Sequence, residues 1–315
     1  MSEFVVAVTA TCRRPLEFAR LLESLKNCGL NLGGMVATDN GNDLATRRAF
    51  EMSGLRGLCL PQEENTGCGG GLQIAEKAAL DHFKNELTHF WILDDDAVVL
   101  PGALDALLDA MRRENADAAC PMVLNETGGI GNFPGLLDRE KFRAVRELKQ
   151  TPQFTARCGE APVPFSWSTG ISLLVTRRAV DELGFHRGDY WVRGEDLEFS
   201  LRITYRFKGI FVPVAGVQHL PVASPGTDSG RGEYVKHCAM LQNLCYTSLH
   251  LPHGRRIART IPGNFLRFLK MWPLSAALAD SLTAFRLGGL LARPADADPA
   301  QTFRSRLAQA GKSRR

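Results

Sequence analysis

The segment FWILDDDAVVLPG, Phe90 to Gly102, places three consecutive aspartates directly behind four apolar residues with the composition of a buried strand. The carboxylates of Asp94 to Asp96 repel one another, and burying them is costly unless a cation compensates their charge. Clustered carboxylate oxygens suit Mg²⁺ or Mn²⁺, which keeps substrate phosphates as further ligands. The alternative interpretation is a solvated turn in which Asp96 caps the helix that follows Pro101.

Similar apolar runs recur along the chain, and helical patterns separate them. Up to residue 125 the runs are FVVAVTA (4–10), GGMVATDNG (33–41), RGLCLP (56–61), THFWILDDDA (88–97) and ADAACPMVL (116–124). This alternation predicts an α/β fold with a doubly wound, mostly parallel sheet. It breaks over about 125–164 and resumes with a strand and a helix in 165–184, a helix in 194–209 and a strand in 210–220.

Bulk properties narrow the class of protein. The net charge of +4 gives no indication of a nucleic-acid partner, although basic residues concentrate in 255–315. The eight cysteines form no CxxC pair and no zinc-type spacing, and Met1 leads into the first apolar run without a signal-peptide pattern. We therefore expect reduced cysteines in a cytoplasmic protein. Charged residues interrupt the late apolar segment 265–292, so we expect no membrane-spanning helix.

Four polar clusters follow the predicted strands of the first half. They are Thr9 to Thr11, Asp39 to Gly41, Asn65 to Gly71, and Asp94 to Asp96. Ligands of an open parallel sheet bind beyond the carboxyl ends of its strands, so the four clusters predict one site. The glycine-rich NTGCGGG turn precedes a predicted helix and has two interpretations. Its backbone amides could bind a phosphate at the helix N-terminus, or the glycines only allow a tight turn.

Two further candidates lie later in the chain. Glu195 and Asp196 start a predicted helix, either as stabilising carboxylates at its N-terminus or as a general base beside Tyr190 and Trp191. His219 ends the last predicted strand, either as a structural residue or as a ligand.

Taken in order, these motifs resemble those of the nucleotide-sugar-dependent glycosyltransferases of family 2, which have the GT-A fold. The resemblance spans about residues 4–220 and rests on VTATCRRP (8–15), TDNG (38–41), NTGCGGG (65–71), WILDDDA (91–97), STG (168–170), RGEDLEFSLRI (193–203) and VQHL (217–220). The motifs are most similar to the bacterial galactofuranosyl- and rhamnosyltransferase-like branch. The resemblance implies a catalytic domain at 1–225, with a nucleotide-sugar half at 1–125 and an acceptor half at 126–225. A mainly helical extension at 226–315 follows.

The resemblance also implies a role for each matching residue. Asp39 would read the nucleobase, and the nucleotide-sugar would be bound by Thr9, Thr11, Arg13, Asp39, Asn65, Gly67, Asp94 and Asp95. Asp94 and Asp96 would form the DxD-type pair, with His219 completing the coordination of Mn²⁺ or Mg²⁺.

On the acceptor side, the resemblance implies that Asp196 is the general base, with Glu195 as its catalytic neighbour. Trp167, Trp191 and Arg193 would line the acceptor site. The implied reaction is inverting transfer of a hexose from a UDP-sugar, with UDP-galactofuranose as the leading example, to a cell-surface glycan or a lipid-linked acceptor.

The chain departs from the family pattern in three places. Asn42 stands where DNGS-type members have serine, and Cys68 stands where many members have a small or apolar residue. Few aromatic residues precede Asp196, which bears on the acceptor site.

Four alternatives remain open from the sequence. A dTDP-rhamnose-dependent rhamnosyltransferase would share the motifs, and a non-catalytic sugar-nucleotide binding protein would share the fold. A haloacid dehalogenase-type phosphohydrolase would carry its aspartates after the first strand. A nucleotidyltransferase would carry a glycine-rich basic loop there, and TATCRRP contains no glycine.

The basic and apolar C-terminal region suggests two roles. It is either a peripheral membrane contact through 255–315, at the inner face of the plasma membrane, or a helix packed on the catalytic domain or on a second subunit of a homo-oligomer.

Overall fold

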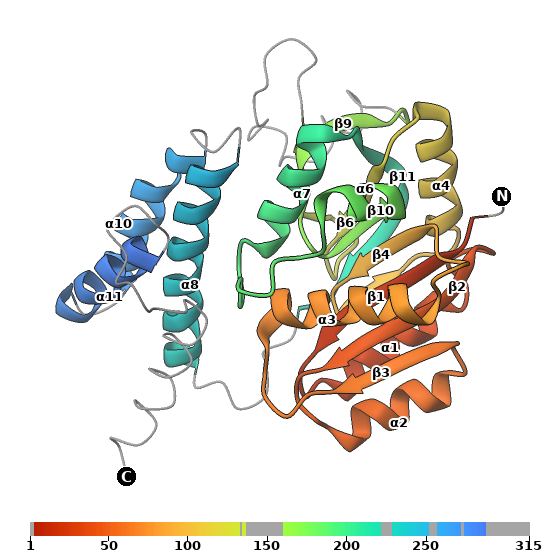
Figure 1. Cartoon of the computed structure of the whole chain (residues 1–315), viewed down its shortest axis with the longest axis horizontal. Helices are drawn as coiled ribbons and strands as arrows, with labels where there is room; N and C mark the ends of the chain where they lie inside the picture. The colour runs from red at the N-terminus through yellow and green to blue at the C-terminus, as the bar shows by residue number, and fades with distance from the viewer. Residues whose placement is uncertain are drawn as a thin grey trace.

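The computed structural model describes residues 3–132, 134–136, 160–221, 229–251, 257–271 and 274–287. Its centre is a sheet in the order β3-β2-β1-β4-β10-β6-β11-β9-β8, with β5 paired to β11 and β7 paired to β6 (Figure 1). Helices cover the sheet, which confirms the predicted α/β class.

The first half of the sheet is parallel throughout. It contains β1 (Val5–Thr11), β2 (Leu32–Asp39), β3 (Gly57–Pro61) and β4 (His89–Leu93), joined through α1 (Pro15–Leu25), α2 (Leu44–Ser53) and α3 (Gly67–His82). Alternate residues of β1 enter two cores, Val5 and Ala7 with α1, and Val6 and Val8 with α3. Burial on both faces explains why these strands read as continuous apolar runs.

The second half mixes strand directions. It comprises β5 (Ala97–Val99), α4 (Ala103–Glu114), β6 (Ala118–Leu124), β7 (Ile130–Asn132), β8 (Gly135–Leu136), β9 (Val163–Trp167), β10 (Ser172–Thr176), α6 (Arg177–Leu183), α7 (Glu195–Arg206) and β11 (Gly209–His219). β10 runs antiparallel between β4 and β6. The start of β10 therefore lies beside the end of β4, and the Asp94 N–H donates to the Ile171 carbonyl over 3.2 Å.

Three helices follow the sheet: α8 (Ser229–His250), α10 (Ile261–Met271) and α11 (Leu274–Leu287). They share an apolar core, and α8 stands between the sheet and the other two (Figure 1). Within the described ranges, no helix combines the length and the hydropathy needed to cross a membrane. The part of the predicted membrane-contact region beyond residue 287 lies outside these ranges.

Helix α8 holds the segment of residues 187–194 that leads into α7. The Asn243 side-chain amide donates to the carbonyls of Val192, over 3.2 Å, and Arg193, over 2.8 Å. The Tyr190 hydroxyl lies 2.9 Å from the Thr247 hydroxyl. Helix α8 precedes the region 255–315, and the described helices of that region, α10 and α11, pack on α8.

A buried ion pair braces the same segment against α3. The Glu76 carboxylate lies 2.7 Å from Nδ1 of His186 and accepts the His186 backbone N–H over 2.8 Å. Both side chains are fully buried, and the His186 ring stacks on Phe199 with centroids 3.8 Å apart. Removing one partner of such a pair leaves a polar group unsatisfied in the interior.

We expect Glu76→Ala to lower the free energy of unfolding by about 3 kcal/mol, because the His186 ring then lacks its carboxylate partner. Urea denaturation followed by circular dichroism measures the change. Lys77→Ala is the matched control, because Lys77 follows Glu76 on α3 and is exposed. Equal denaturation midpoints for the two variants would contradict the assigned role of the pair.

Candidate active site

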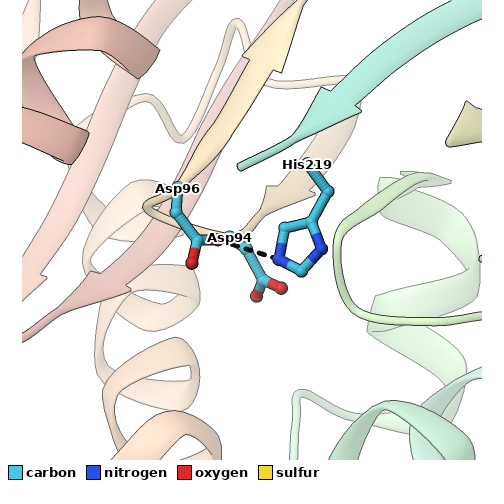
Figure 2. Close-up of side chains that lie close together, drawn as sticks. All are labelled: Asp94, Asp96 and His219. Carbon is cyan, nitrogen blue, oxygen red and sulfur yellow. Dashed lines mark ion pairs between the residues drawn. The ribbon is translucent and has the colours of Figure 1, made fainter. Parts of the chain in front are cut away.

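The aspartates of the opening segment form the turn between β4 and β5, and His219 ends β11. Antiparallel pairing of β5 with β11 sets Ala97 opposite His219, which brings the imidazole to this turn. His219 Nε2 lies 3.1 Å from Asp96 Oδ1. One ligand atom each from Asp94, Asp96 and His219 falls within 4.8 Å of the others (Figure 2).

Each aspartate has different partners. Arg14 Nη1 lies 3.1 Å from Asp95 Oδ1 and 3.0 Å from Asp96 Oδ2. The Thr11 hydroxyl donates to Asp95 over 2.7 Å. Asp95 is thus held by Arg14 and Thr11, and Asp96 by Arg14 and His219. The cap of α4 is Gly102, which excludes the alternative of Asp96 as its cap.

Arg14 was missed by the sequence analysis, which named its neighbour Arg13. Arg13 is exposed and has a left-handed backbone, with φ of 55°. Arg14 precedes α1 and turns its guanidinium back to the aspartates. A pattern of two adjacent arginines does not indicate which one faces the site, although Pro15 at the start of α1 marks the chain reversal.

The pKa values follow these partners. Removal from water, and then the charge of Asp96, raise the pKa of Asp94 to about 7. Burial acts to raise the pKa of Asp96, but the hydrogen bond and charge of His219, together with Arg14, lower it overall. Burial acts to lower the pKa of His219, but the bond to Asp96 raises it overall.

This donor set fits a divalent cation. Two carboxylates and an imidazole are ligands that Mn²⁺ accepts, and Mg²⁺ favours the carboxylates. Asp94 is the carboxylate with the raised pKa, so a cation among Asp94, Asp96 and His219 would supply the charge that Asp94 needs.

A second acidic pair lies at the start of α7. The two Asp196 carboxylate oxygens accept the N–H of Gly170, over 3.1 Å, and of Leu197, over 2.7 Å. Burial is the main cause of the raised pKa of Asp196. A Cβ built on Gly170 would lie 3.3 Å from Asp196 Cβ and 4.0 Å from Asp94 Oδ1. Gly170 therefore joins the two acidic groups into one site.

Glu195 is almost completely buried beside Asp196. Burial, and then the charge of Asp196, raise the pKa of Glu195 to about 8. The Cys68 thiol is in hydrogen-bond contact with Glu195, and Glu195 Oε2 has no hydrogen-bond partner in the described part of the chain. Cys68, noted above as a departure from the family pattern, thus adjoins the catalytic candidates.

The strand-end clusters of β2 and β3 also meet. The Asn40 side-chain amide donates to the Gly67 carbonyl over 2.9 Å and accepts the Thr66 N–H over 3.0 Å. Asp39 is buried and accepts the N–H groups of Gly41 and Asp43. Burial raises the pKa of Asp39.

Other predicted nucleotide-binding residues line the same edge of the sheet. Asn65 accepts the Gly67 N–H over 2.8 Å, and its amide lies 3.6 Å from Cys12 Sγ. Thr9 is fully buried, and its hydroxyl has no hydrogen-bond partner among the described residues.

The glycines of the NTGCGGG turn allow close packing. Gly67 has φ of 77°, and a Cβ there would lie 2.1 Å from the Trp191 carbonyl oxygen. A Cβ on Gly69 would lie 2.1 Å from the Tyr190 carbonyl oxygen. The Cys68 N–H donates to the Trp191 carbonyl over 2.7 Å. The segment before α7 therefore presses on the start of α3, a constraint that the sequence did not indicate.

The three predicted acceptor residues lie in different surroundings. The Trp191 ring packs against Gly67, next to Cys68. Arg193 pairs with Glu233 of α8 over 2.6 Å. The Trp167 ring packs against Gly135 of β8, at the edge of the sheet. Of the three, Trp191 is the residue that contacts the backbone of Cys68, whose thiol adjoins Glu195.

Comparison with known proteins identifies the family of the chain. The family model described as "Glycosyl transferase family 2" matches residues 6–165, half of the chain. No curated protein matches the chain.

Three solved structures are similar in fold. GalNAc-T7 with UDP, GalNAc and Mn²⁺ has a TM-score of 0.57 at 14% identity, over 89% of this chain and 55% of that one. S. aureus TarS has a TM-score of 0.57 at 13% identity, and the match covers 90% of this chain and 49% of TarS. The mannosyltransferase PcManGT from Pyrobaculum calidifontis, in complex with GDP-Man and Mn²⁺, has a TM-score of 0.50 at 15% identity. The match covers 99% of this chain and 81% of PcManGT. The chain spans about half the length of the first two, and these likenesses confirm the expected GT-A fold.

We expect Mn²⁺ affinity to rise with pH by about tenfold per pH unit near neutrality and by up to about a hundredfold per unit at lower pH, because Asp94 and His219 must both lose a proton to act as ligands. The pKa of about 7 for Asp94 and the raised pKa of His219 set this range. Calorimetry in two buffers of different ionisation enthalpy measures the affinity and the proton release. An affinity that does not change with pH, with no proton released, would exclude these ligands.

We expect Glu195→Gln to become more stable relative to the wild type as pH rises. The pKa of Glu195 is about 8 in the folded protein and about 4.5, the ordinary value of a glutamate, in the unfolded chain, so the folded state binds the extra proton. Stability is therefore lost as pH rises through this window, and glutamine removes the loss. The relative gain between pH 6 and 8 is about 2 kcal/mol. Urea denaturation at both pH values tests it, and parallel profiles would be the opposing result.

Proposed function

Because the chain belongs to glycosyl transferase family 2, we propose that it transfers a sugar from a nucleoside-diphosphate donor to an acceptor hydroxyl, with inversion at the anomeric carbon. The observation that carries the proposal is the contact made through Gly170, which sets a candidate metal site beside a buried carboxylate at the start of α7. An inverting transfer needs these two groups on opposite sides of the reacting carbon.

The donor side is formed by the turn after β4. Asp94, Asp96 and His219 would hold Mn²⁺ or Mg²⁺. When bound, the cation stabilises the negative charge that develops on the leaving diphosphate. Arg14 contributes a second positive charge at the same edge and keeps Asp95 and Asp96 oriented. Mn²⁺ with UDP or GDP-Man in two structures of similar fold supports this assignment.

The nucleoside would bind along the ends of β1 to β3, through Thr9, Thr11, Asp39, Asn65 and Gly67. These residues line one edge of the parallel sheet, where ligands of such sheets bind. Arg13 is exposed next to them and is available to the diphosphate. Asp39 accepts two backbone N–H groups of its own turn, which would fix its carboxylate toward the base.

Asp196 would act as the general base. Its carboxylate takes the proton of the acceptor hydroxyl while the hydroxyl oxygen bonds to the anomeric carbon and the bond to the diphosphate oxygen breaks. Two backbone N–H groups fix its position, and burial raises its pKa toward the working range. Glu195, with a pKa of about 8, is largely protonated at neutral pH, which reduces the repulsion that the Asp196 carboxylate meets.

For the donor we propose a UDP-sugar, with UDP-galactofuranose first and dTDP-rhamnose as the alternative. The acceptor would be a cell-surface glycan or a lipid-linked glycan made on the cytoplasmic side of the membrane. Trp191, beside Cys68, is the aromatic residue best placed to contact it. The alternative of a binding protein without catalysis is disfavoured, because Asp94, Asp96 and Asp196 are all present.

We expect Asp196→Asn to lower turnover by about 10²–10⁴-fold and to leave nucleotide affinity nearly unchanged, because asparagine has the same shape and keeps one of the two accepted N–H bonds but cannot take up the proton of the acceptor hydroxyl. Release of nucleoside diphosphate from a UDP-sugar panel measures turnover, and calorimetry measures affinity. Asp181→Asn, on the exposed surface of α6, is the control. Wild-type turnover by Asp196→Asn would remove Asp196 from the mechanism.

A further inference from the structure

Helix α11 packs three small residues and Phe285 inward and exposes two leucines. Ala277, Ser281 and Ala284 are fully buried against α8 and α10. Leu278 and Leu282 are 40% and 50% exposed. These leucines lie one turn apart on the same side of the helix. A helix that served only to pack on its own protein would place leucines inward, so the outer side of α11 indicates contact with another apolar surface.

Helix α10 also exposes large apolar side chains and adds charge. It buries Phe268 in the shared core and leaves Leu266 and Met271 55% and 50% exposed. Arg267 and Lys270 are exposed next to them. At 100° per residue these four positions share a sector of about 140°, away from Phe268. We call these four residues, with Leu278 and Leu282, the outer face.

The charge of this region is opposite to that of the rest of the chain. Residues 251–287 contain six basic side chains and one acidic one, Asp280. Asp280 is turned inward, where the Tyr234 hydroxyl donates to it over 2.5 Å. Residues 251–315 contain 12 of the 38 basic and 3 of the 34 acidic residues, so residues 1–250 are net acidic. A negatively charged partner would therefore be drawn to this end of the molecule.

We propose that the outer face of α10 and α11 docks on an anionic lipid surface. The exposed leucines and Met271 enter the boundary between headgroups and acyl chains, and Arg267 and Lys270 reach the phosphates. Each basic residue near an anionic surface strengthens binding, and the basic chain beyond residue 287 adds to this attraction.

A second copy of the chain fits the outer face less well. A two-fold interface brings the same residues of both copies together, so Arg267 and Lys270 would meet their own counterparts. No acidic side chain of the face offsets that repulsion among the described residues of α10 and α11, since Asp280 is turned inward. A lipid surface carries the complementary charge.

The arrangement connects the docked helices with the site. Helix α8 lies between the sheet and the helices α10 and α11 (Figure 1), and its Asn243 holds the segment that leads to Glu195 and Asp196. Docking would therefore set the acceptor side of the site at a fixed distance from the lipid surface, where a lipid-linked acceptor is presented.

Vesicle flotation of the full chain tests the proposal. We expect binding to phosphatidylcholine vesicles that contain phosphatidylglycerol, weaker binding at high salt, and little binding to phosphatidylcholine alone. Leu278→Ser with Leu282→Ser, and separately Arg267→Glu with Lys270→Glu, should each lower the partition coefficient by at least about tenfold. Nucleotide binding, measured by calorimetry, should be unchanged in both, which separates this test from that of the catalytic site.

Matched controls come from the catalytic domain. Leu30→Ser with Met52→Ser removes side chains that are 97% and 86% exposed, and Arg48→Glu with Lys77→Glu makes the same charge change. Both controls should float like the wild type. Failure of the wild type to float, or equal flotation of all variants, would overturn the proposal. A dimer in light scattering that the leucine variants dissociate would assign the outer face to self-association instead.

Discussion

The close placement of four carboxylates, two of which meet at Gly170, is the constraint on which the site depends. Asp94, Asp96, Glu195 and Asp196 come from two distant parts of the chain and repel one another. The protein offsets only part of this repulsion with Arg14 and His219. The rest of the repulsion is relieved because Glu195 is protonated and because the pKa of Asp94 is raised. A divalent cation bound at Asp94 would neutralise this remaining negative charge.

The sheet topology produces this meeting. Insertion of β10 antiparallel to β4 brings Gly170 to the end of β4, and pairing of β5 with β11 brings His219 to Asp96. The segment of residues 187–194 then has to cross the start of α3, and glycines at 67 and 69 let its backbone pass. The ion pair of Glu76 with His186 and the bonds from α8 hold that segment from both sides. The C-terminal helices are in this sense part of the support of the site.

Much of the fold and the identity of the acidic groups could be predicted from sequence, because strand burial and strand-end polarity leave local patterns. The runs 4–10 and 88–97 predicted β1 and β4, and the order of motifs predicted the metal candidates that the structure groups together. Other features depend on contacts between distant residues and leave no local pattern. The direction of β10, the choice of Arg14 over Arg13, and the packing role of Gly67 and Gly69 belong to this group. The exposed leucines of α11 read as an ordinary amphipathic pattern until the buried side was known.

The most direct test of the account is calorimetric titration with UDP and with dTDP, each with and without Mn²⁺, on the wild type and on Asp96→Ala. The account predicts that one nucleotide binds the wild type in a Mn²⁺-dependent manner and that Asp96→Ala loses this dependence while remaining folded. Equal binding with and without Mn²⁺, or a Mn²⁺ dependence that survives in Asp96→Ala, would contradict the assignment of Asp94, Asp96 and His219 as the metal site.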